Sequence, residues 1–345
     1  MEQNHVISIS NLRKRFNLEA GFFARMGRYV NAVNGVSLCI GRNETYGLVG
    51  ESGCGKTTTA RLLVRMYEAD EGEIIFRSRD GSVENVRNLK GRDFKHYREQ
   101  VKYVFQDPAR SLNPRMTVYD VLTSGARWSM KRRGYAGNLS KDPSESSRQF
   151  CEKILREEAA AILEEVGLSA ADMERRPTEF SGGQRQRISI ARGLLMKPDL
   201  LICDEVVSAL DVSIQGQILN LLLDLRSSRA SSQQELSFLF IAHDLKVACY
   251  FCDRIGVMYR GEIMEEAPAA EIWKHGLHPY TELLFSSAGK IPGQEPPASP
   301  ARAANTPETD GCSFVSRCAY AKEICYREKP DLRTVGENHL VRCWR

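Results

Sequence analysis

The chain has 345 residues, which at roughly 150 residues per domain predicts about two domains. Hydrophobic residues make up 42% and charged residues 27%, and 48 basic residues against 44 acidic ones give a net charge of +4. This composition is that of an ordinary globular protein, so it excludes wholesale disorder and gives no bulk electrostatic signal for nucleic-acid binding.

From the sequence we expect neither a membrane span nor a secretory leader. No stretch approaches the roughly 18 consecutive apolar residues that a spanning helix needs. The N-terminus has no basic region followed by an apolar core, so we expect no signal peptide. We therefore expect a cytoplasmic protein that reaches a membrane only through a partner, with its ten cysteines in a reducing environment.

A short apolar strand at residues 46–49 leads into a glycine-rich loop that precedes a helix. The loop fits the pattern G-x-x-x-x-G-K-[ST] in full. It consists of Gly50, Glu51, Ser52, Gly53, Cys54, Gly55, Lys56 and Thr57, with Thr58 continuing into the helix. Glycines let backbone N–H groups converge on phosphate oxygens, Lys56 reaches the β- and γ-phosphates, and the Thr57 hydroxyl suits Mg²⁺. A glycine-rich turn that precedes Lys-Thr by chance is the alternative.

Helical signals dominate from about residue 106 to 198, with a polar stretch at 131–148 that predicts a solvated insertion. Within this region a turn precedes a helix whose apolar residues recur at helical spacing. The turn consists of Ser181, Gly182, Gly183 and Gln184. Ser181 with Gln184 three residues later fits an ordinary capping box. The glycine pair weakens a helix start unless the backbone approaches something closely, and an anion is the natural candidate.

An apolar run at residues 200–203 ends in Asp204 and Glu205. Such a run predicts a strand buried on both faces of a parallel sheet, and ligands gather at the carboxyl ends of such strands. We expect Asp204 to help hold Mg²⁺ and Glu205 to polarise the water that attacks a γ-phosphate. Two solvated acids that begin a loop are the alternative.

Strand signals return in the last third of the chain, at residues 236–242, 255–259 and 262–266, and the last two flank a predicted hairpin turn at Arg260 and Gly261. Residues 291–310 are rich in proline and predict a linker. Four cysteines then crowd into the last 34 residues: Cys312, Cys318, Cys325 and Cys343. Four thiolates suit Zn²⁺ or a [4Fe–4S] cluster, although the spacing lacks the C-x-x-C pair of common zinc sites.

The order of these motifs resembles that of the ATP-binding subunit of an ABC transporter. Gln106 matches the family's glutamine loop, and residues 208–211 match its D-loop. His243 matches the switch histidine, and Phe16 lies where the family carries an aromatic residue that stacks on adenine. Val206 departs from the proline that usually follows the catalytic glutamate, which affects the rigidity of that loop but leaves both carboxylates in place.

The resemblance implies an α/β fold: a P-loop NTPase (RecA-like) core with the antiparallel β-subdomain and the α-helical subdomain of ABC proteins. It assigns the nucleotide-binding domain to residues 1–288, with the helical subdomain at about 106–198. A Pro-rich linker at 289–310 and a small Cys-rich C-terminal extension at 311–345 follow.

One branch of the family resembles this chain in particular: the importers of dipeptides, oligopeptides and related solutes such as nickel complexes. Residues 111–115 and 278–281 are typical of that branch, as is the Gly311-Cys312 pair with Arg317-Cys318. Members carry a similar cysteine tail, and some bind an iron–sulfur cluster there. The resemblance therefore favours [4Fe–4S] over zinc or free thiols, in a structural role.

Membership implies an ATPase that works as a head-to-tail dimer, with each ATP held between the phosphate loop of one subunit and the serine-glycine turn of the other. The implied catalytic residues are Glu205, His243, Lys56 and Gln106. The implied Mg²⁺ ligands are Thr57, Gln106 and Asp204. The implied nucleotide contacts are Phe16, residues 50–58, and Ser181, Gly182, Gly183 and Gln184.

The implied partners are a second, paralogous ATPase subunit, two transmembrane permease subunits and, indirectly, an extracellular or periplasmic solute-binding protein. They place the chain at the cytoplasmic face of the inner or plasma membrane, without nucleic acid. A soluble ABC ATPase that is not coupled to transport is one alternative, but the chain lacks a second ATPase half and long coiled-coil insertions. A non-enzymatic scaffold is the other, and the complete set of hydrolytic residues argues against it.

Overall fold

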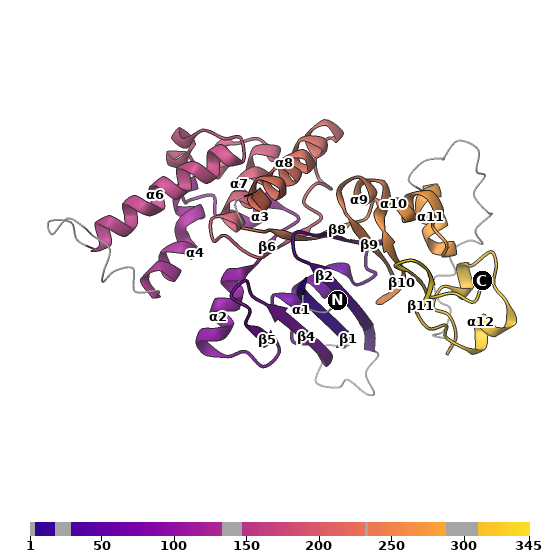
Figure 1. Ribbon diagram of the computed structural model, residues 1–345. Coiled ribbons are helices and arrows are strands. Elements are labelled where there is room, and N and C mark those ends of the chain that lie inside the picture. The colour runs from indigo at the N-terminus through magenta and orange to yellow at the C-terminus, as the bar shows by residue number, and fades with distance from the viewer. Residues whose placement is uncertain (1–3, 18–28, 133–146, 232–233, 288–309) are drawn as a thin grey trace, which may run out of the picture. The chain divides into compact units, whose positions relative to one another are not determined.

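The structure is a computed structural model that describes residues 4–17, 29–132, 147–231, 234–287 and 310–345 (Figure 1). The chain divides into two compact units: Met1–Leu89 with Ser237–Arg345, and Lys90–Leu236. The predicted insertion at 131–148 and the predicted linker at 289–310 lie almost wholly outside the described residues.

The first unit contains an antiparallel sheet in the order β2-β1-β4-β5. Its strands are β1 (His5–Asn17), β2 (Tyr29–Gly41), β4 (Glu71–Arg77) and β5 (Val83–Asn85). The central strand β1 pairs with both β2 and β4. Its buried residues Ile7, Ile9 and Leu12 lie on a strand rich in β-branched residues, as a half-buried sheet requires.

The same unit contains a second, mixed sheet in the order β11-β12-β10-β9-β3-β8. Its strands are β3 (Thr45–Val49), β8 (Ser237–Ala242), β9 (Arg254–Tyr259), β10 (Glu262–Pro268), β11 (Arg333–Gly336) and β12 (His339–Val341). The strand β3 is parallel to both β8 and β9, and every residue of β3 and β8 is buried. Continuous apolar sequence is what strands covered on both faces need.

The predicted hairpin between β9 and β10 is confirmed. Tyr259 faces Glu262 in the antiparallel register. The two turn residues, Arg260 and Gly261, have φ values of 45° and 83°. Positive φ at both positions is the geometry of the tight turns that match strand twist, and glycine adopts it at low cost.

The helices α1 (Lys56–Leu63), α9 (Leu245–Phe251) and α10 (Ala269–His275) pack against strands of these sheets, and the C-terminal segment adds two strands to the mixed sheet. The unit also contains α11 (Pro279–Ser287) and α12 (Glu323–Arg327), with a 3₁₀ turn η4 (Val315–Arg317). β12 pairs with β10 and β11, both antiparallel, so the cysteine-bearing segment is anchored by backbone hydrogen bonds (Figure 1). The predicted boundary between the nucleotide-binding domain and the tail stays a prediction.

The second unit is mostly helical around one parallel strand pair, β6 and β7. Its elements are α2 (Gly91–Gln100), β6 (Val101–Val104), α3 (Pro108–Ser111), α4 (Val118–Arg132), α6 (Ser147–Glu165), η2 (Ala170–Glu174), η3 (Pro177–Glu179), α7 (Gly182–Leu194), β7 (Leu200–Asp204) and α8 (Val212–Ser231). The predicted strand at 200–203 is confirmed as the fully buried β7. The predicted bounds of the helical subdomain stay a prediction.

Within the described ranges, the helices are all too short or too polar to cross a membrane.

Candidate functional site

The glycine-rich loop joins β3 to α1. Gly55 has a φ of 110°, and a Cβ at this position would lie 2.0 Å from the carbonyl oxygen of Ala32, so only glycine fits. Gly53 also has a positive φ, but the space around its missing Cβ is open. Because α1 begins at Lys56, its first backbone N–H groups face out of the helix end toward the loop. The loop therefore has the form of an anion cradle.

Lys56 is buried beneath this loop, with 3% of its surface exposed. Its Nζ donates hydrogen bonds to the carbonyl oxygens of Gly50 at 2.7 Å and Glu51 at 3.0 Å. Burial raises the pKa of the neighbouring Cys54 thiol, which therefore stays neutral beside the lysine. Ser52 and Gly53 are exposed, while Thr57 and Thr58 are half-buried in the first turn of α1.

His243 lies at the same edge of the mixed sheet as this loop. In the parallel register between β3 and β8, Val49 pairs with Ala242. The next residues are Gly50 and His243, so the loop and the histidine leave adjacent strands side by side. His243 is exposed, and Asp244 after it caps α9 by accepting a hydrogen bond from the Lys246 backbone N–H. The phosphate loop and the histidine therefore lie at the same sheet edge in the first unit, and the catalytic roles predicted for them stay predictions.

In the second unit, Gln106 and Glu205 meet at the carboxyl ends of β6 and β7. The side-chain Nε2 of Gln106 donates a 2.7 Å hydrogen bond to Oε2 of Glu205. Asp204 is 3% exposed and ends β7, while Glu205 follows it with a φ of 49°. The left-handed backbone at Glu205 breaks the extended conformation directly after Asp204, so β7 ends between the two carboxylate residues.

The hydroxyl of Tyr103 donates a hydrogen bond to Oδ2 of Asp204. Tyr103 lies on β6 in register with Ile202 of β7. The Tyr103 hydroxyl therefore fixes the orientation of the Asp204 carboxylate through Oδ2. Nothing in the local sequence distinguishes this tyrosine from an ordinary strand residue, and we did not predict it.

The turn at residues 181–184 caps α7. Ser181 Oγ accepts from the backbone N–H of Gln184 at 3.3 Å, and Gln184 Oε1 accepts from the backbone N–H of Ser181 at 3.0 Å. The capping box is therefore present. A Cβ at Gly183 would lie 2.8 Å from Cγ2 of Ile214, whereas one at Gly182 would meet nothing closer than 3.8 Å. Packing is therefore a further reason for glycine at 183, the surroundings of Gly182 are more open, and the predicted nucleotide contacts of both glycines stay predictions.

Phe16 is half-buried near the end of β1, in register with Val30 of β2. Its ring packs edge-on against Tyr67, with ring centroids 5.2 Å apart. The ammonium of Lys14 lies 5.6 Å from the centroid of the same ring. Tyr67 therefore supports the Phe16 ring, for which stacking on adenine was predicted. The sequence analysis did not identify Tyr67.

The sequence matches known families over most of these motifs. Residues 33–208 match the family described as ABC transporter, and residues 264–325 match the family described as Oligopeptide/dipeptide transporter, C-terminal region. The chain is 38% identical over 358 residues to Oligopeptide transport ATP-binding protein AppF of Bacillus subtilis (strain 168), which covers 99% of this chain and 97% of that protein. This chain belongs to the ABC transporter family, as an ATP-binding subunit.

Other relatives of this ABC subunit agree. It is 42% identical over 297 residues to Dipeptide transport ATP-binding protein DppF of Lactococcus lactis subsp. cremoris (strain MG1363), covering 86% of this chain and 84% of that protein. The fold matches cbiO1 from Clostridium perfringens, part of the ABC transporter complex cbiONQ, with a TM-score of 0.61 at 22% identity, over 79% of this chain and 92% of that one. The predicted family, α/β cassette fold and ATPase class are confirmed.

Two residues from the motifs typical of the peptide-importer branch, Tyr280 and Arg317, bind Glu51 of the phosphate loop. The hydroxyl of Tyr280 accepts a 2.8 Å hydrogen bond from the backbone N–H of Glu51. The guanidinium of Arg317 donates two hydrogen bonds, both 2.8 Å, to the Glu51 carboxylate. Sequence reasoning noted both motifs but gave neither residue a role, because the contacts span 229 and 266 residues of chain.

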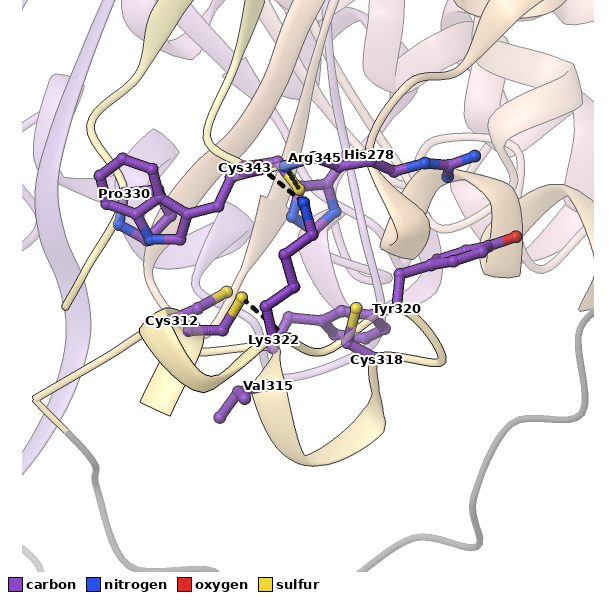
Figure 2. Close-up of a pocket in the computed structure, with 12 residues that line it drawn as sticks. His278, Cys312, Val315, Cys318, Tyr320, Lys322, Pro330, Cys343 and Arg345 are labelled. Carbon is purple, nitrogen blue, oxygen red and sulfur yellow. Dashed lines mark hydrogen bonds between the residues drawn. The ribbon is translucent and has the colours of Figure 1, made fainter. Parts of the chain in front are cut away.

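The four C-terminal cysteines of the ABC subunit line one pocket. Figure 2 shows the side chains of Cys312, Cys318 and Cys343 around it, and Cys325 also lines it. Backbone N–H groups donate to two of the sulfurs: that of Lys322 to Cys325 at 3.5 Å and that of Arg345 to Cys343 at 3.4 Å. In the described part of the chain, however, no three metal-ligating side chains are arranged to hold a single metal ion.

Burial raises the pKa of two of these cysteines. It raises the pKa of Cys312 to about 11 and raises the pKa of Cys318 as well. These two thiols are therefore protonated at neutral pH. Because a metal binds the thiolate, loading this pocket must release protons and become tighter as pH rises.

Proposed function

We propose that this chain hydrolyses ATP at a site built from the phosphate loop, the β7 carboxylates and His243. The parallel register of β3 and β8 carries the proposal, since it places the loop beside His243 at one sheet edge. In the proposed site, Lys56 and the backbone N–H groups of the loop hold the β- and γ-phosphates of ATP, and Phe16 stacks on the adenine. The start of α7, which Ser181 caps, presents its backbone N–H groups to the nucleotide of a partner subunit.

Glu205 acts as the base that orients and polarises the attacking water. Its hydrogen bond from Gln106 leaves the other carboxylate oxygen, Oε1, available to accept a proton from that water. His243 contributes charge stabilisation on the γ-phosphate side. The work of these residues is positioning and electrostatic stabilisation, because phosphoryl transfer to water needs no covalent intermediate with the protein.

Three oxygen donors suit Mg²⁺: the hydroxyl of Thr57, the amide oxygen of Gln106 and the carboxylate of Asp204. Hard oxygen ligands with one carboxylate are the set that Mg²⁺ prefers beside nucleotide phosphates. The Gln106 amide fits this role because its nitrogen is occupied by Glu205, which leaves its oxygen as the free end. The bound ion neutralises charge on the β- and γ-phosphates.

The site is completed by a second ATPase subunit. Gly182, with no atom closer than 3.8 Å to a would-be Cβ, keeps the backbone face that a partner's γ-phosphate needs. We propose that the partner is a paralogous chain and that ATP closes the dimer head-to-tail. Hydrolysis removes the bridging phosphate and lets the subunits part.

We propose that this cycle drives import of dipeptides or oligopeptides, or of a related solute such as a nickel complex. The C-terminal match at residues 264–325 and the peptide-transport names of the bacterial relatives support this substrate class. The subunit then binds two transmembrane permease subunits at the cytoplasmic face of the membrane, and a solute-binding protein delivers the solute from outside.

We propose further that the cysteine pocket holds a [4Fe–4S] cluster with a structural role. The four cysteines share one pocket, and two sulfurs accept backbone hydrogen bonds of the kind that tune such clusters. Four thiolates spread around a cluster need not converge on one point, unlike the ligands of a single zinc ion. Bound there, the cluster supplies a covalent cross-link for the segment.

Substitution of the proposed base tests the enzymatic proposal. We expect Glu205→Gln to lower the ATP turnover number by about 100-fold or more while nucleotide still binds, because the loss of a general base costs that order of rate. Glu164→Gln, an exposed carboxylate of α6, is the matched control and keeps its rate. Equal turnover in the two variants contradicts the role of Glu205.

Copurification tests the transport proposal. A tagged chain expressed with its native partners should bring down two membrane permease subunits and a related ATPase. A chain that recovers none of them but hydrolyses ATP is the soluble ABC ATPase of the alternative. Two copies of this chain alone on the permease contradict the paralogous partner.

Anaerobic purification tests the cluster. We expect brown protein with visible iron–sulfur absorbance and about four iron atoms per chain, lost in Cys318→Ser and kept in Cys151→Ser, a cysteine of α6. Colourless protein that carries stoichiometric zinc rejects the cluster.

A further inference from the structure

The C-terminal segment reaches into the phosphate loop at Glu51. Both terminal nitrogens of Arg317 bind the two oxygens of that carboxylate, each at 2.8 Å. The Arg317 side chain is only 15% exposed and that of Glu51 31% exposed. A two-pronged arginine–carboxylate pair fixes direction as well as distance. Its hydrogen bonds to Glu51 raise the pKa of Arg317 further above its ordinary value, so the charge is permanent.

The C-terminal segment holds Arg317 ready for this contact. Arg317 ends the 3₁₀ turn η4, and its backbone N–H donates to the carbonyl oxygen of Phe314. The guanidinium carbon lies 5.7 Å from the ring centroid of Tyr259 and 5.6 Å from that of Phe314. These two aromatic rings therefore help to orient the Arg317 guanidinium in addition to its pairing with Glu51.

The aromatic residue that anchors this turn is buried among cassette residues. The Phe314 ring is 1% exposed and lies 5.3 Å, centroid to centroid, from both Tyr259 and Tyr280. Tyr280 in turn accepts the backbone N–H of Glu51. The segment thus contacts the loop residue directly through Arg317, and indirectly through the Phe314–Tyr280 packing.

Glu51 is held at three points as a result. Its backbone N–H is bound by Tyr280, its carbonyl oxygen by Lys56 and its side chain by Arg317. A carboxylate in a loop that binds a polyphosphate repels that ligand unless it is neutralised and turned aside. Arg317 does both, because its positive charge neutralises the Glu51 carboxylate and its two hydrogen bonds hold the Glu51 side chain in one orientation.

We propose that Arg317 is a positioning residue for the phosphate loop, through which the C-terminal segment sets the affinity of this subunit for nucleoside triphosphate. The inference rests on the proposed ATP site. It assigns to the segment beyond the cassette a task in nucleotide binding, separate from any metal in the cysteine pocket.

A double-mutant cycle on the full-length chain tests this role. The probe is a fluorescent ATP analogue titrated at fixed Mg²⁺ and salt. We expect Arg317→Ala to raise the Kd about tenfold, as the loss of a charge-assisted pair predicts. Arg317→Lys keeps the charge but loses the fork, so it recovers part of the affinity. The Kd of the Glu51→Gln variant is the reference for the second half of the cycle. Adding Arg317→Ala to this variant should change its Kd by less than about twofold, because no carboxylate at position 51 is left to neutralise.

Controls separate positioning from folding. Arg345→Ala removes another arginine of the same segment, whose partner is Glu282 at 2.8 Å and not the Glu51 carboxylate, so the Kd of this variant stays at the wild-type value. Arg317→Met keeps the apolar stem over the aromatic rings, which guards against loss of fold, and its unfolding midpoint without nucleotide is measured in parallel. If Arg317 had only a structural role, its substitution would lower the unfolding midpoint equally in the wild-type and the Glu51→Gln backgrounds.

The outcomes are distinct. A tenfold rise in Kd that vanishes in the Glu51→Gln background supports the role of Arg317. An Arg317→Met or Arg317→Ala protein that binds as wild type, or a loss that persists without the Glu51 charge, overturns it. Wild-type chain that binds no nucleotide refutes the proposed function itself, which is a different result.

Discussion

The side-chain amide of Gln106 donates a 2.7 Å hydrogen bond to the carboxylate of Glu205. The two residues are 99 positions apart, and adjacent parallel strands bring them to one sheet edge. In the proposed site, this glutamine both holds the base and offers its amide oxygen to Mg²⁺. Movement of the Gln106 loop would therefore change the position of the base and the metal ligand together.

Tyr103 supports the neighbouring carboxylate, and its removal tests the assignment of Asp204 to Mg²⁺. We expect Tyr103→Phe to raise the Mg²⁺ concentration for half-maximal ATPase activity about tenfold, with little change at saturating Mg²⁺. Partners that orient a metal ligand are worth that order of affinity. Tyr250→Phe, at an exposed tyrosine, is the control. An unchanged Mg²⁺ dependence in Tyr103→Phe contradicts the metal role of Asp204.

The two glycines of the serine-glycine turn should differ in what they do. We expect Gly183→Ala to cost about 1–3 kcal/mol of unfolding free energy, because its Cβ would lie 2.8 Å from Ile214. The cost should shrink in an Ile214→Ala background, measured by urea unfolding.

Gly182→Ala should leave stability within about 1 kcal/mol, since its surroundings are open. It should instead weaken ATP-dependent dimerisation, measured by sedimentation with the partner subunit. A Gly182→Ala chain that dimerises as wild type would show that this turn is only a helix cap.

Phe16 should contribute to recognition of the base and not of the phosphates. Stacking on an aromatic ring is worth about 1–3 kcal/mol, so Phe16→Ala should raise the Kd for ATP about tenfold or more. Phe16→Tyr keeps the ring face and should bind normally. Tripolyphosphate, which has no base, should bind both variants alike in a competition assay. Equal losses for ATP and tripolyphosphate would mean that Phe16 acts through the loop.

Lys102 on β6 gives this protein a pH-dependent stability. Burial lowers the pKa of Lys102 to about 8, and Glu99 opposes the shift. The unfolded chain, with a lysine pKa near 10.4, binds the proton more readily between about pH 8 and 10.4, so this group makes stability rise with pH across that window. Below about pH 8, the buried Lys102 ammonium destabilises the folded protein to its full extent.

Replacement of this lysine should therefore stabilise the protein. We expect Lys102→Met to add about 2 kcal/mol at pH 7 and less at pH 9.5, measured by urea unfolding at both values. Lys153→Met, at an exposed lysine of α6, should add nothing at either pH. A gain for Lys102→Met that is the same at both pH values would show that packing, not charge, is responsible.

Local patterns predicted the parts of this fold that depend on neighbouring residues. The buried strand β7, the hairpin at Arg260 and Gly261 and the capping box at Ser181 follow from apolar runs, positive-φ preferences and side-chain spacing over a few residues. The phosphate loop followed from a dense motif in the required strand-to-helix context.

The support of the site was not predictable in the same way. Tyr103 reaches Asp204 only because β6 lies beside β7, and Arg317 reaches Glu51 across 266 residues. For Gly183 the sequence predicted a close approach to an anion, which stays a prediction, and the packing against Ile214 is a further reason for glycine that depends on the fold. Contacts between distant segments follow from the folded topology, which single-chain periodicity does not encode.

The most direct measurement is a structure of the assembled transporter carrying Glu205→Gln and held with ATP and Mg²⁺. The account predicts each triphosphate between Lys56 of one ATPase subunit and the serine-glycine turn of the other. A triphosphate enclosed by this polypeptide alone, with the neighbouring turn far from it, would contradict the account.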